Sequence, residues 1–256
     1  MPNYPQKLVL QCNFLSVPVD FSFLMVKKDQ RERREIFAFA TLRKKFHSVP
    51  TFLHMQNQST LAVFDYDHTL ITGDALWSFL FYVAGGVNLA WAVAVTMAQW
   101  IWRYTVNKHD PEISDMRTFV KAGLLRRLLA GKIVTEIAPA VEKLRAWQQW
   151  NEPMRQAVLD HAAQGHHIVI ASGSLDVYLH TLAKDLPHEA IICTEIGIVD
   201  GRFTGEMMSG NCVRQRKAEL VRDYITAHGP FADSWGYGNF PHDVPMLGVV
   251  RKRVLV

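Results

Sequence analysis

The most informative part of the sequence is Leu61-Ala62-Val63-Phe64-Asp65-Tyr66-Asp67-His68-Thr69-Leu70. Its first four residues are apolar and predict a buried β-strand that ends in two carboxylates, Asp65 and Asp67. Because open α/β sheets bind ligands at the carboxyl ends of their strands, we expect a functional site here. If the chain turns after Phe64, one carboxylate and a backbone carbonyl can meet one cation while the other carboxylate transfers protons. The alternative interpretation is a solvated, Asp-rich turn.

The length and composition are those of an ordinary globular protein. The chain has 256 residues, of which 49% are hydrophobic and 20% charged, enough for one large domain or for a core with an insertion. Its three cysteines, Cys12, Cys193 and Cys212, form no CxxC pair and no even set. This pattern argues against a disulfide-stapled secreted fold and against a structural zinc site. A reducing, cytoplasmic setting is therefore expected.

The positive charge of the chain is concentrated in its first segment. Residues 1–54 contain nine Lys or Arg against four Asp or Glu, whereas residues 55–256 contain nineteen against twenty. Pro18 and Pro50 interrupt the first segment, whose apolar part precedes its charges, unlike a signal peptide. We expect residues 1–54 to be a poorly ordered appendage or the product of a misplaced translation start, with the compact protein beginning near Met55. The basic run is interpreted as a solvated face with no nucleic-acid partner; contact with nucleic acid or anionic lipid is the alternative.

The least polar part of the chain is residues 75–102, which contain no Asp, Glu, Lys, Arg or His and seven aromatic residues. By length this stretch could span a bilayer. Gly85 and Asn88 predict instead two helices of about ten and about fifteen residues, and a single crossing would separate Asp65 from the rest of the predicted site. Two interpretations stay open: the buried face of a helical subdomain, or a helix pair lying on a membrane surface.

The following residues continue as helices. Apolar residues at spacings of three and four predict amphipathic helices over Thr118–Leu129 and Ile133–Trp147. Asn151 is a predicted N-cap of the next helix, which ends at Gly165. Residues 74–150 are therefore expected to form an all-helical insertion directly after the Asp-x-Asp strand.

From residue 165 onward, strands alternate with helices, which predicts an α/β fold with a parallel sheet. The expected strands are His166–Ala171, Ala190–Thr194, a hairpin over Ile198–Phe203, Ser234–Tyr237 and a closing strand Val254–Val256. The expected helices are Leu175–Leu186 and Val213–His228, and truncation of the chain after the closing strand is left open. Between the first strand and the first helix we expect a Ser172-Gly173-Ser174 turn, whose hydroxyl and N–H groups could bind an anion at the helix N-terminus. The alternative for this turn is an ordinary N-cap.

Several charged and polar residues follow these strands and suggest one chemistry. Three carboxylates, Asp65, Asp67 and Asp243, require a cation, and hard oxygen ligands suit Mg²⁺. A cation, Lys217 and the donors around Ser172 together provide what a transferring phosphoryl group requires.

Four segments in this order resemble the motifs of the haloacid dehalogenase superfamily. They are DYDHTL (65–70), ASGS (171–174), the lysine-bearing NCVRQRKAEL (211–220) and GNFPHDVPML (238–247). Their spacing is similar to that of phosphoserine-phosphatase-like members, subfamily IB. The resemblance covers about residues 60–256 and implies a Rossmann-like core over residues 55–73 and 151–256. It also implies an all-helical cap over residues 74–150, inserted between the first and second motifs.

The resemblance also implies the roles of individual residues. Asp65 would be the nucleophile that forms an aspartyl-phosphate, and Asp67 would protonate the leaving group and then activate water. Ser172 and the N–H of Gly173 would hold phosphate oxygens. Lys217 would neutralise the charge shared by the nucleophile and the phosphoryl group.

The implied metal site departs from the family pattern at one position. Mg²⁺ would be held by the Asp65 side chain, the Asp67 carbonyl and the fourth motif, with Asn239 and Asp243. The fourth motif usually begins with Asp, and Asn239 removes one negative charge, so weaker metal binding is expected. Asp74 stands where related amino-acid phosphatases bind the substrate's amino group; its alternative interpretation is the N-cap of the first cap helix.

The resulting hypothesis is a Mg²⁺-dependent phosphatase acting on a phosphomonoester. Its substrate would be a small phosphorylated metabolite or a phospholipid head group, the latter because residues 75–102 are aromatic and uncharged and some related proteins act on lipids. The protein would be cytoplasmic, with peripheral membrane contact through residues 75–102. The alternatives are a non-catalytic phosphate-binding or membrane-associated module, and a phosphotransferase.

Overall fold

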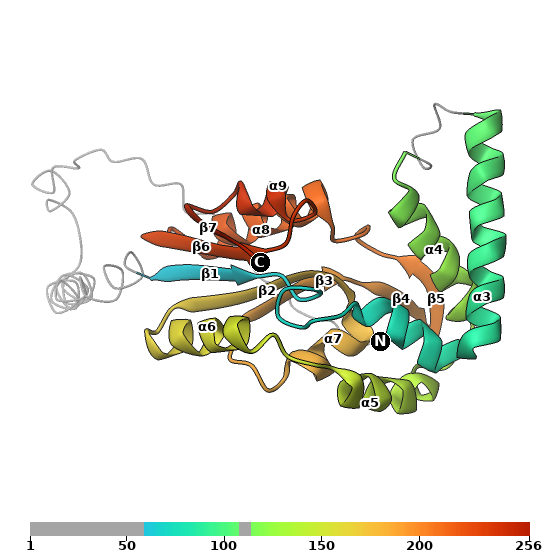
Figure 1. Ribbon diagram of the computed structural model, residues 1–256, viewed down its shortest axis with the longest axis horizontal. Helices are drawn as coiled ribbons and strands as arrows, with labels where there is room; N and C mark the ends of the chain where they lie inside the picture. Colours follow the sequence, from blue (N-terminus) through green and yellow to red (C-terminus); the bar gives the residue numbers. More distant parts are fainter. Residues whose placement is uncertain (1–58, 108–113) are drawn as a thin grey trace, which may run out of the picture. The chain divides into compact units, whose positions relative to one another are not determined.

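The computed structural model describes residues 59–107 and 114–256 (Figure 1). The expected appendage over residues 1–54 and the expected boundary near Met55 lie outside the described residues.

The core is a five-stranded sheet in the order β3-β2-β1-β6-β7, in which every neighbouring pair is parallel. The strands are β1 (Thr60–Phe64), β2 (His167–Leu175), β3 (Ala190–Thr194), β6 (Asp233–Gly238) and β7 (Lys252–Leu255). Phe64 of the central strand is in register with Ile170 of β2 and Tyr237 of β6. The chain segments that follow these three strands therefore lie along one edge of the sheet. The predicted parallel α/β fold is confirmed.

Helices cover both faces of this sheet (Figure 1). The helices are α6 (Glu152–Ala163), α7 (Asp176–Ala183), α8 (Arg214–His228) and the short α9 (Val244–Leu247). Side chains of a strand alternate between the two faces of the sheet. Ala62 and Phe64 accordingly belong to one buried cluster, and Leu61 and Val63 belong to a second cluster that includes Val221 of α8. The four successive apolar residues of β1, Leu61 to Phe64, are explained by burial on both faces.

The predicted Ser172-Gly173-Ser174 turn is wrong. β2 continues through these residues to Leu175, and α7 starts only at Asp176. The pairing of β2 with β3 shifts register between Ala171 and Leu175, so the segment remains extended but bulges out of the ladder. The serines are consequently presented by a strand and not by the N-terminus of a helix.

The segment between β1 and α6 is helical. It consists of α3 (Ala75–Val106), α4 (Met116–Leu128), a 3₁₀ turn η4 (Val134–Ile137) and α5 (Ala138–Trp147). Gly85, with φ 76° and ψ 162°, interrupts the helical conformation of α3, as expected, but the second part continues to Val106 and is longer than predicted. The helix predicted from Ile133 starts as the 3₁₀ turn and becomes α-helical only at Ala138.

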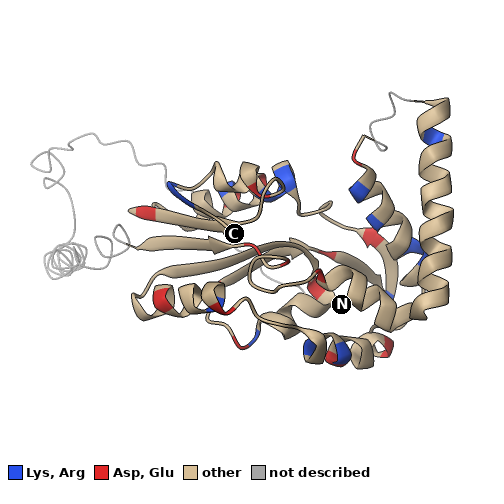
Figure 2. Ribbon diagram, viewed as in Figure 1, with Lys and Arg blue, Asp and Glu red and all other residues tan. Residues whose placement is uncertain are grey.

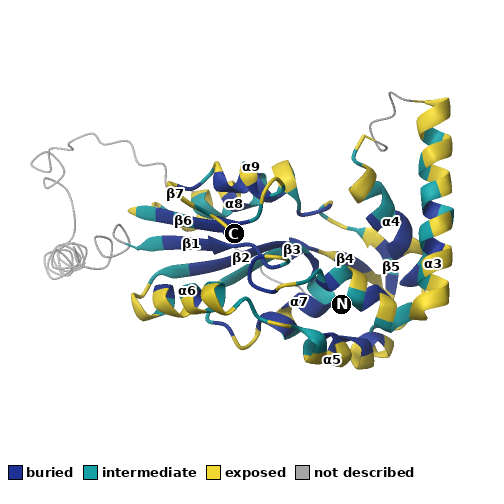
Figure 3. Cartoon of the chain, viewed as in Figure 1, coloured by how far each residue is buried: buried dark blue, intermediate teal, exposed yellow. Residues whose placement is uncertain are grey.

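Much of α3 is exposed to solvent (Figure 3). Its buried residues are Ala75, Phe79, Leu80, Ala92 and Thr96. Trp91 is 61% exposed and Trp102 69% exposed. The interpretation of this stretch as a buried helix face is therefore wrong for most of its length, because α4 and α5 contact α3 from one side only. By length and composition, α3 could cross a membrane.

A β-hairpin from the second half of the chain lies against the helical segment. It consists of β4 (Ile196–Val199) and β5 (Arg202–Met207), and its predicted Asp200-Gly201 turn is confirmed, with positive φ at both residues. The N–H of Gly131 donates to Phe203, whose N–H in turn donates to the carbonyl of Lys132. The helical segment between β1 and α6, called the cap below, therefore packs against a hairpin that follows β3.

Candidate active site

Asp65 is the first residue after β1 and lies buried at the edge of the sheet. Its N–H donates to the carbonyl of Tyr237 on the neighbouring strand, at 2.9 Å, which fixes the backbone. Its Oδ1 accepts a hydrogen bond from Lys217 Nζ at 2.7 Å, and its Oδ2 accepts one from Thr69 Oγ1 at 2.9 Å. Burial raises the pKa of Asp65 to about 7; Lys217 opposes this shift and Asp243 adds to it.

Lys217 lies in the first turn of α8 and connects two carboxylates. Its Nζ donates to Asp65 Oδ1 and, at 2.6 Å, to Asp243 Oδ1, and all three side chains are buried. Burial alone would lower the pKa of Lys217, but the two carboxylates outweigh it and raise the pKa. The two carboxylates thus favour the charged form of Lys217, and its role in neutralising the nucleophile stays a prediction.

Asp67 faces two serines of β2. Its Oδ2 accepts hydrogen bonds from Ser174 Oγ at 2.6 Å and Ser172 Oγ at 3.3 Å, while its Oδ1 accepts one from the N–H of Ala75 at 2.8 Å. Burial, and then the nearby charge of Asp74, raise the pKa of Asp67. A carboxyl group with a raised pKa can hold a proton and release it to a leaving group.

At the end of β2, Gly173 and Ser174 line the pocket, whereas the predicted Ser172 is fully buried and does not line it. Ser172 and Ser174 are two positions apart on a strand and so lie on the same face. The N–H of Ser174 donates to Ser172 Oγ at 2.9 Å. Gly173 lines the pocket between them, and a Cβ atom there would lie only 2.7 Å from Val213 Cγ1, so a larger residue would not fit. Sequence reasoning omitted Ser174, although its spacing from Ser172 was the available signal.

The fourth motif meets the first motif at the Asp67 carbonyl. Asn239 Nδ2 donates to that carbonyl at 3.1 Å, and its backbone N–H donates to Asp243 Oδ2 at 3.0 Å. Both carboxylate oxygens of Asp243 therefore accept hydrogen bonds from the protein. Gly238 permits this close approach, because a Cβ there would lie 2.6 Å from that of Asp243.

The donor atoms around Asp65 suit a hard cation. No group of three or more His, Cys, Asp or Glu residues within 59–107 and 114–256 is arranged to hold a metal ion. The available set is instead one carboxylate of Asp65, the backbone carbonyl of Asp67 and the amide of Asn239, whose oxygen and nitrogen exchange places by a simple rotation. These are oxygen ligands of the kind that Mg²⁺ accepts, with one charge fewer than Asp in place of Asn239 would give. The residues thus fit Mg²⁺, with Asp243 supporting Lys217 and Asn239.

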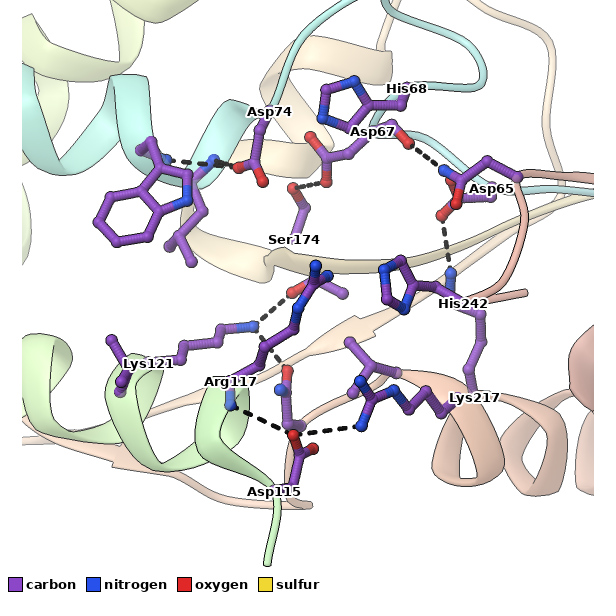
Figure 4. Close-up of a pocket in the computed structure, with 18 of the residues that line it drawn as sticks. Asp65, Asp67, His68, Asp74, Asp115, Arg117, Lys121, Ser174, Lys217 and His242 are labelled. Atoms are coloured by element: carbon purple, nitrogen blue, oxygen red, sulfur yellow. Dashed lines mark hydrogen bonds and ion pairs between the residues drawn. The ribbon is translucent and has the colours of Figure 1, made fainter. Parts of the chain in front are cut away.

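A cavity of about 730 Å³ joins these residues to the cap (Figure 4). Asp65, Asp67 and Lys217 line one end of it. The helical segment contributes apolar residues, which are Leu76, Trp77, Val93, Met97, Met116, Val120 and Leu124. Asp74 lies at its margin, where its carboxylate caps α3 by accepting from the N–H groups of Leu76 and Trp77. The N-cap interpretation of Asp74 is confirmed, and its contact with a substrate stays a prediction.

Further polar residues of the pocket were not found from the sequence. Arg117 and Lys121 come from α4, Asn211 from the loop before α8 and His242 from the fourth motif. The two cations belong to an amphipathic helix in which Lys and Arg normally face solvent, so the pattern carried no signal for them.

Comparison with known proteins gives a consistent picture. The family model described as haloacid dehalogenase-like hydrolase matches residues 62–248. Phosphoserine phosphatase SerB2 of Mycobacterium tuberculosis (strain ATCC 25618 / H37Rv) is 24% identical over 189 residues, which are 73% of this chain but only 42% of SerB2. The chain therefore spans less than half the length of this curated relative.

Solved structures share the fold at low sequence identity. A protein of unknown function from Bordetella pertussis Tohama I has a TM-score of 0.61 and 22% identity, with 77% of this chain and 90% of that chain covered. A structure described as a phospho-aspartyl intermediate analogue of phosphoserine phosphatase has a TM-score of 0.53 and 13% identity, with 77% and 86% covered. With the matched family model and the four motifs gathered at one edge of the sheet, the chain belongs to the haloacid dehalogenase-like hydrolase family.

Proposed function

We propose that this protein is a Mg²⁺-dependent phosphatase that hydrolyses a phosphomonoester through an aspartyl-phosphate. The observation that supports this most strongly is the meeting of Asp65, Lys217 and Asp243, which are up to 178 positions apart (243 − 65), in hydrogen bonds of 2.6–2.7 Å. Burying two carboxylates around one lysine costs desolvation free energy, and a catalytic role for the three residues would explain that cost. Phosphoryl transfer requires both the nucleophile and the cation that this arrangement provides.

The first half of the reaction forms the covalent intermediate. A carboxylate oxygen of Asp65 attacks phosphorus, and the bond between phosphorus and the alcohol oxygen of the substrate breaks. Asp67, protonated through its raised pKa, gives its proton to the departing oxygen. Lys217 stabilises the negative charge on Asp65 and on the phosphoryl oxygens, and the hydroxyl of Ser172 and the N–H of Gly173 bind those oxygens.

The second half returns the enzyme to its starting state. Asp67, now a carboxylate, takes a proton from a water molecule, whose oxygen attacks the phosphorus of the aspartyl-phosphate. The bond between phosphorus and Asp65 breaks, and inorganic phosphate leaves. Asp65, the Asp67 carbonyl and Asn239 would hold Mg²⁺, which would offset the charge of the phosphoryl group when bound.

For the substrate, we propose a phosphomonoester that carries an apolar portion, such as a lipid-linked head group. The apolar residues that α3 and α4 contribute to the cavity support this choice, because a small polar metabolite would leave them in contact with water. A small phosphorylated metabolite is the other candidate, supported by the likeness to SerB2, whose name states that it acts on phosphoserine.

The exposed face of α3 supports a place at a membrane surface. From Ala75 to Val106 the only charged residue is Arg103, as Figure 2 shows. Trp91 and Trp102 project to solvent from this helix, and tryptophan is favoured at the interface between lipid and water. The same helix contributes Val93 and Met97 to the cavity from its opposite face, so α3 would lie between the membrane surface and the site.

Phosphatase activity is tested directly with p-nitrophenyl phosphate. We expect turnover with Mg²⁺, loss of turnover with EDTA, and loss in the Asp65→Asn variant. A non-catalytic phosphate-binding module would show binding of inorganic phosphate without turnover under all three conditions. A panel of phosphorylated metabolites and lipid-linked phosphomonoesters then identifies the substrate class, and kcat/KM should be highest for members with an apolar portion.

A further inference from the structure

Lys121 is a buried lysine of the cap that contacts the catalytic part of the chain. Its side chain belongs to α4 and the residue is only 6% exposed. The ammonium donates hydrogen bonds to the carbonyl of Gly173, to Asn211 Oδ1 at 2.8 Å and to Thr194 Oγ1 at 3.1 Å. These acceptors come from the end of β2, the end of β3 and the loop before α8, as Figure 4 shows in part.

The partners of Lys121 distinguish it from a substrate-binding cation. An ammonium has three hydrogens, and all three are used by oxygens of the protein. Within the described residues no carboxylate lies within ion-pair distance of it. Burial lowers the pKa of Lys121 to about 8, with Asp67 opposing the shift. If the Lys121 ammonium turned toward a ligand, its hydrogen bonds to the protein would break. Its burial and its three partners therefore fit a positioning role.

Lys121 is the innermost of three polar links between α4 and the catalytic motifs. Asp115, Thr118 and Lys121 are three positions apart and therefore lie on one face of the helix. Asp115 pairs with Arg214 at 3.3 Å, and Thr118 Oγ1 accepts from Asn211 Nδ2 at 2.8 Å. Asn211 thus contacts both Thr118 and Lys121. Only the link through Lys121 reaches the end of β2.

The carbonyl that Lys121 holds belongs to the peptide that orients both serines. The nitrogen of this same peptide is that of Ser174, which donates to Ser172 Oγ. Fixing the carbonyl of Gly173 therefore fixes the direction of the N–H group and, through it, the Ser172 hydroxyl. Both serine hydroxyls in turn contact Asp67.

We propose that Lys121 is a positioning residue that fastens cap helix α4 to the serine-bearing end of β2, so that the phosphate-binding groups are oriented only while the cap is docked. The inference rests on the proposed phosphatase function. Under this proposal the cap orients the phosphate-binding groups, in addition to lining the cavity. Loss of Lys121 should then impair even a substrate too small to contact the cap.

The test compares Lys121→Met with Lys143→Met, a control at an exposed lysine of α5 outside the cavity. With p-nitrophenyl phosphate, Lys121→Met should lower kcat by about tenfold or more, as expected when a charged hydrogen bond is lost, and should weaken inhibition by inorganic phosphate. Lys143→Met should behave as the wild type. In a Ser172→Ala background, the effect of Lys121→Met should largely disappear, because the lysine acts through that hydroxyl.

A second variant, Thr194→Val, tests the inference if Lys121→Met does not fold. Thr194→Val keeps the volume of the side chain but removes an acceptor of Lys121 and a donor to the Gly173 carbonyl, so we expect a smaller loss of kcat in the same direction. Wild-type kcat in both Lys121→Met and Thr194→Val would overturn the inference. So would a loss confined to KM for substrates with an additional anionic group, or a loss that adds fully to that of Ser172→Ala. Absence of turnover and of phosphate inhibition in the wild type would overturn the phosphatase proposal instead.

Discussion

Replacement of Lys217 by Met tests the electrostatic arrangement at the centre of the site. The lysine lies 2.7 Å from Asp65 Oδ1 and 2.6 Å from Asp243 Oδ1, and no more than 5% of any of the three side chains is exposed. Met fills similar space without a charge, so the substitution leaves two buried carboxylates without a cation. Removal of one partner from a buried ion pair costs about 3–5 kcal/mol, and we expect a loss of unfolding free energy of that size at about pH 8.

The loss of unfolding free energy in Lys217→Met should depend on pH, and the raised pKa of Asp65 sets the direction of this dependence. In the wild type burial raises its pKa to about 7, against an ordinary value of 3.8. The native state therefore binds a proton more readily than the unfolded chain, and this group gains stability as the pH falls from about 7 toward 3.8. Without Lys217 the pKa of Asp65 should rise further, and its protonation removes one unpaired charge. The destabilisation by Lys217→Met should accordingly be smaller at about pH 5 than at about pH 8.

Urea unfolding in EDTA, followed by circular dichroism at both pH values, measures this difference, and Lys143→Met is the matched control. The control should lose less than about 1 kcal/mol at either pH, as expected for an exposed lysine. A loss of under about 1 kcal/mol for Lys217→Met, or an equal loss at both pH values, would refute the argument.

Three further variants address the metal, the proton transfer and the membrane surface. Asn239→Asp restores a charge beside the Asp67 carbonyl, so activity should saturate at lower Mg²⁺ concentration; an unchanged titration would count against the metal assignment. Asp67→Asn should slow release of an alkyl alcohol by about 10²–10⁴-fold but retain the burst of p-nitrophenolate, which leaves without a proton. Equal slowing of both would show that Asp67 is not the acid. Trp91→Glu with Trp102→Glu should abolish cosedimentation with phosphatidylglycerol vesicles, and undiminished cosedimentation would exclude α3 as the contact.

The fold and the meeting of the motif residues at one edge of the sheet could be predicted because their signals are local. The apolar run of β1 and the carboxylates that follow it are adjacent in the sequence, and the strands that carry the other motifs have the same apolar character. Parallel strands align their carboxyl ends, so the meeting of Asp65, Ser172 and Asn239 follows once the strands are recognised. The N-cap at Asp74 is likewise a local feature.

The features that could not be predicted depend on partners far away in the sequence. The extended conformation of Ser172 to Ser174 results from the pairing of β2 with β3. This pairing shifts register, and no local sequence pattern indicates the shift. The exposure of α3 depends on which of its sides the neighbouring helices cover. Lys121 resembles any solvent-facing lysine of an amphipathic helix until Gly173, Thr194 and Asn211 are placed around it.

The most direct test of the proposed function is to identify the residue that becomes phosphorylated. The wild-type protein is mixed with a phosphomonoester, quenched in acid within the first turnover and analysed by peptide mass spectrometry. A phosphoryl group on Asp65, absent in the Asp65→Asn variant and absent when Mg²⁺ is removed, is the predicted result. Turnover without a phosphorylated protein, or phosphorylation of a different residue, would contradict the mechanism.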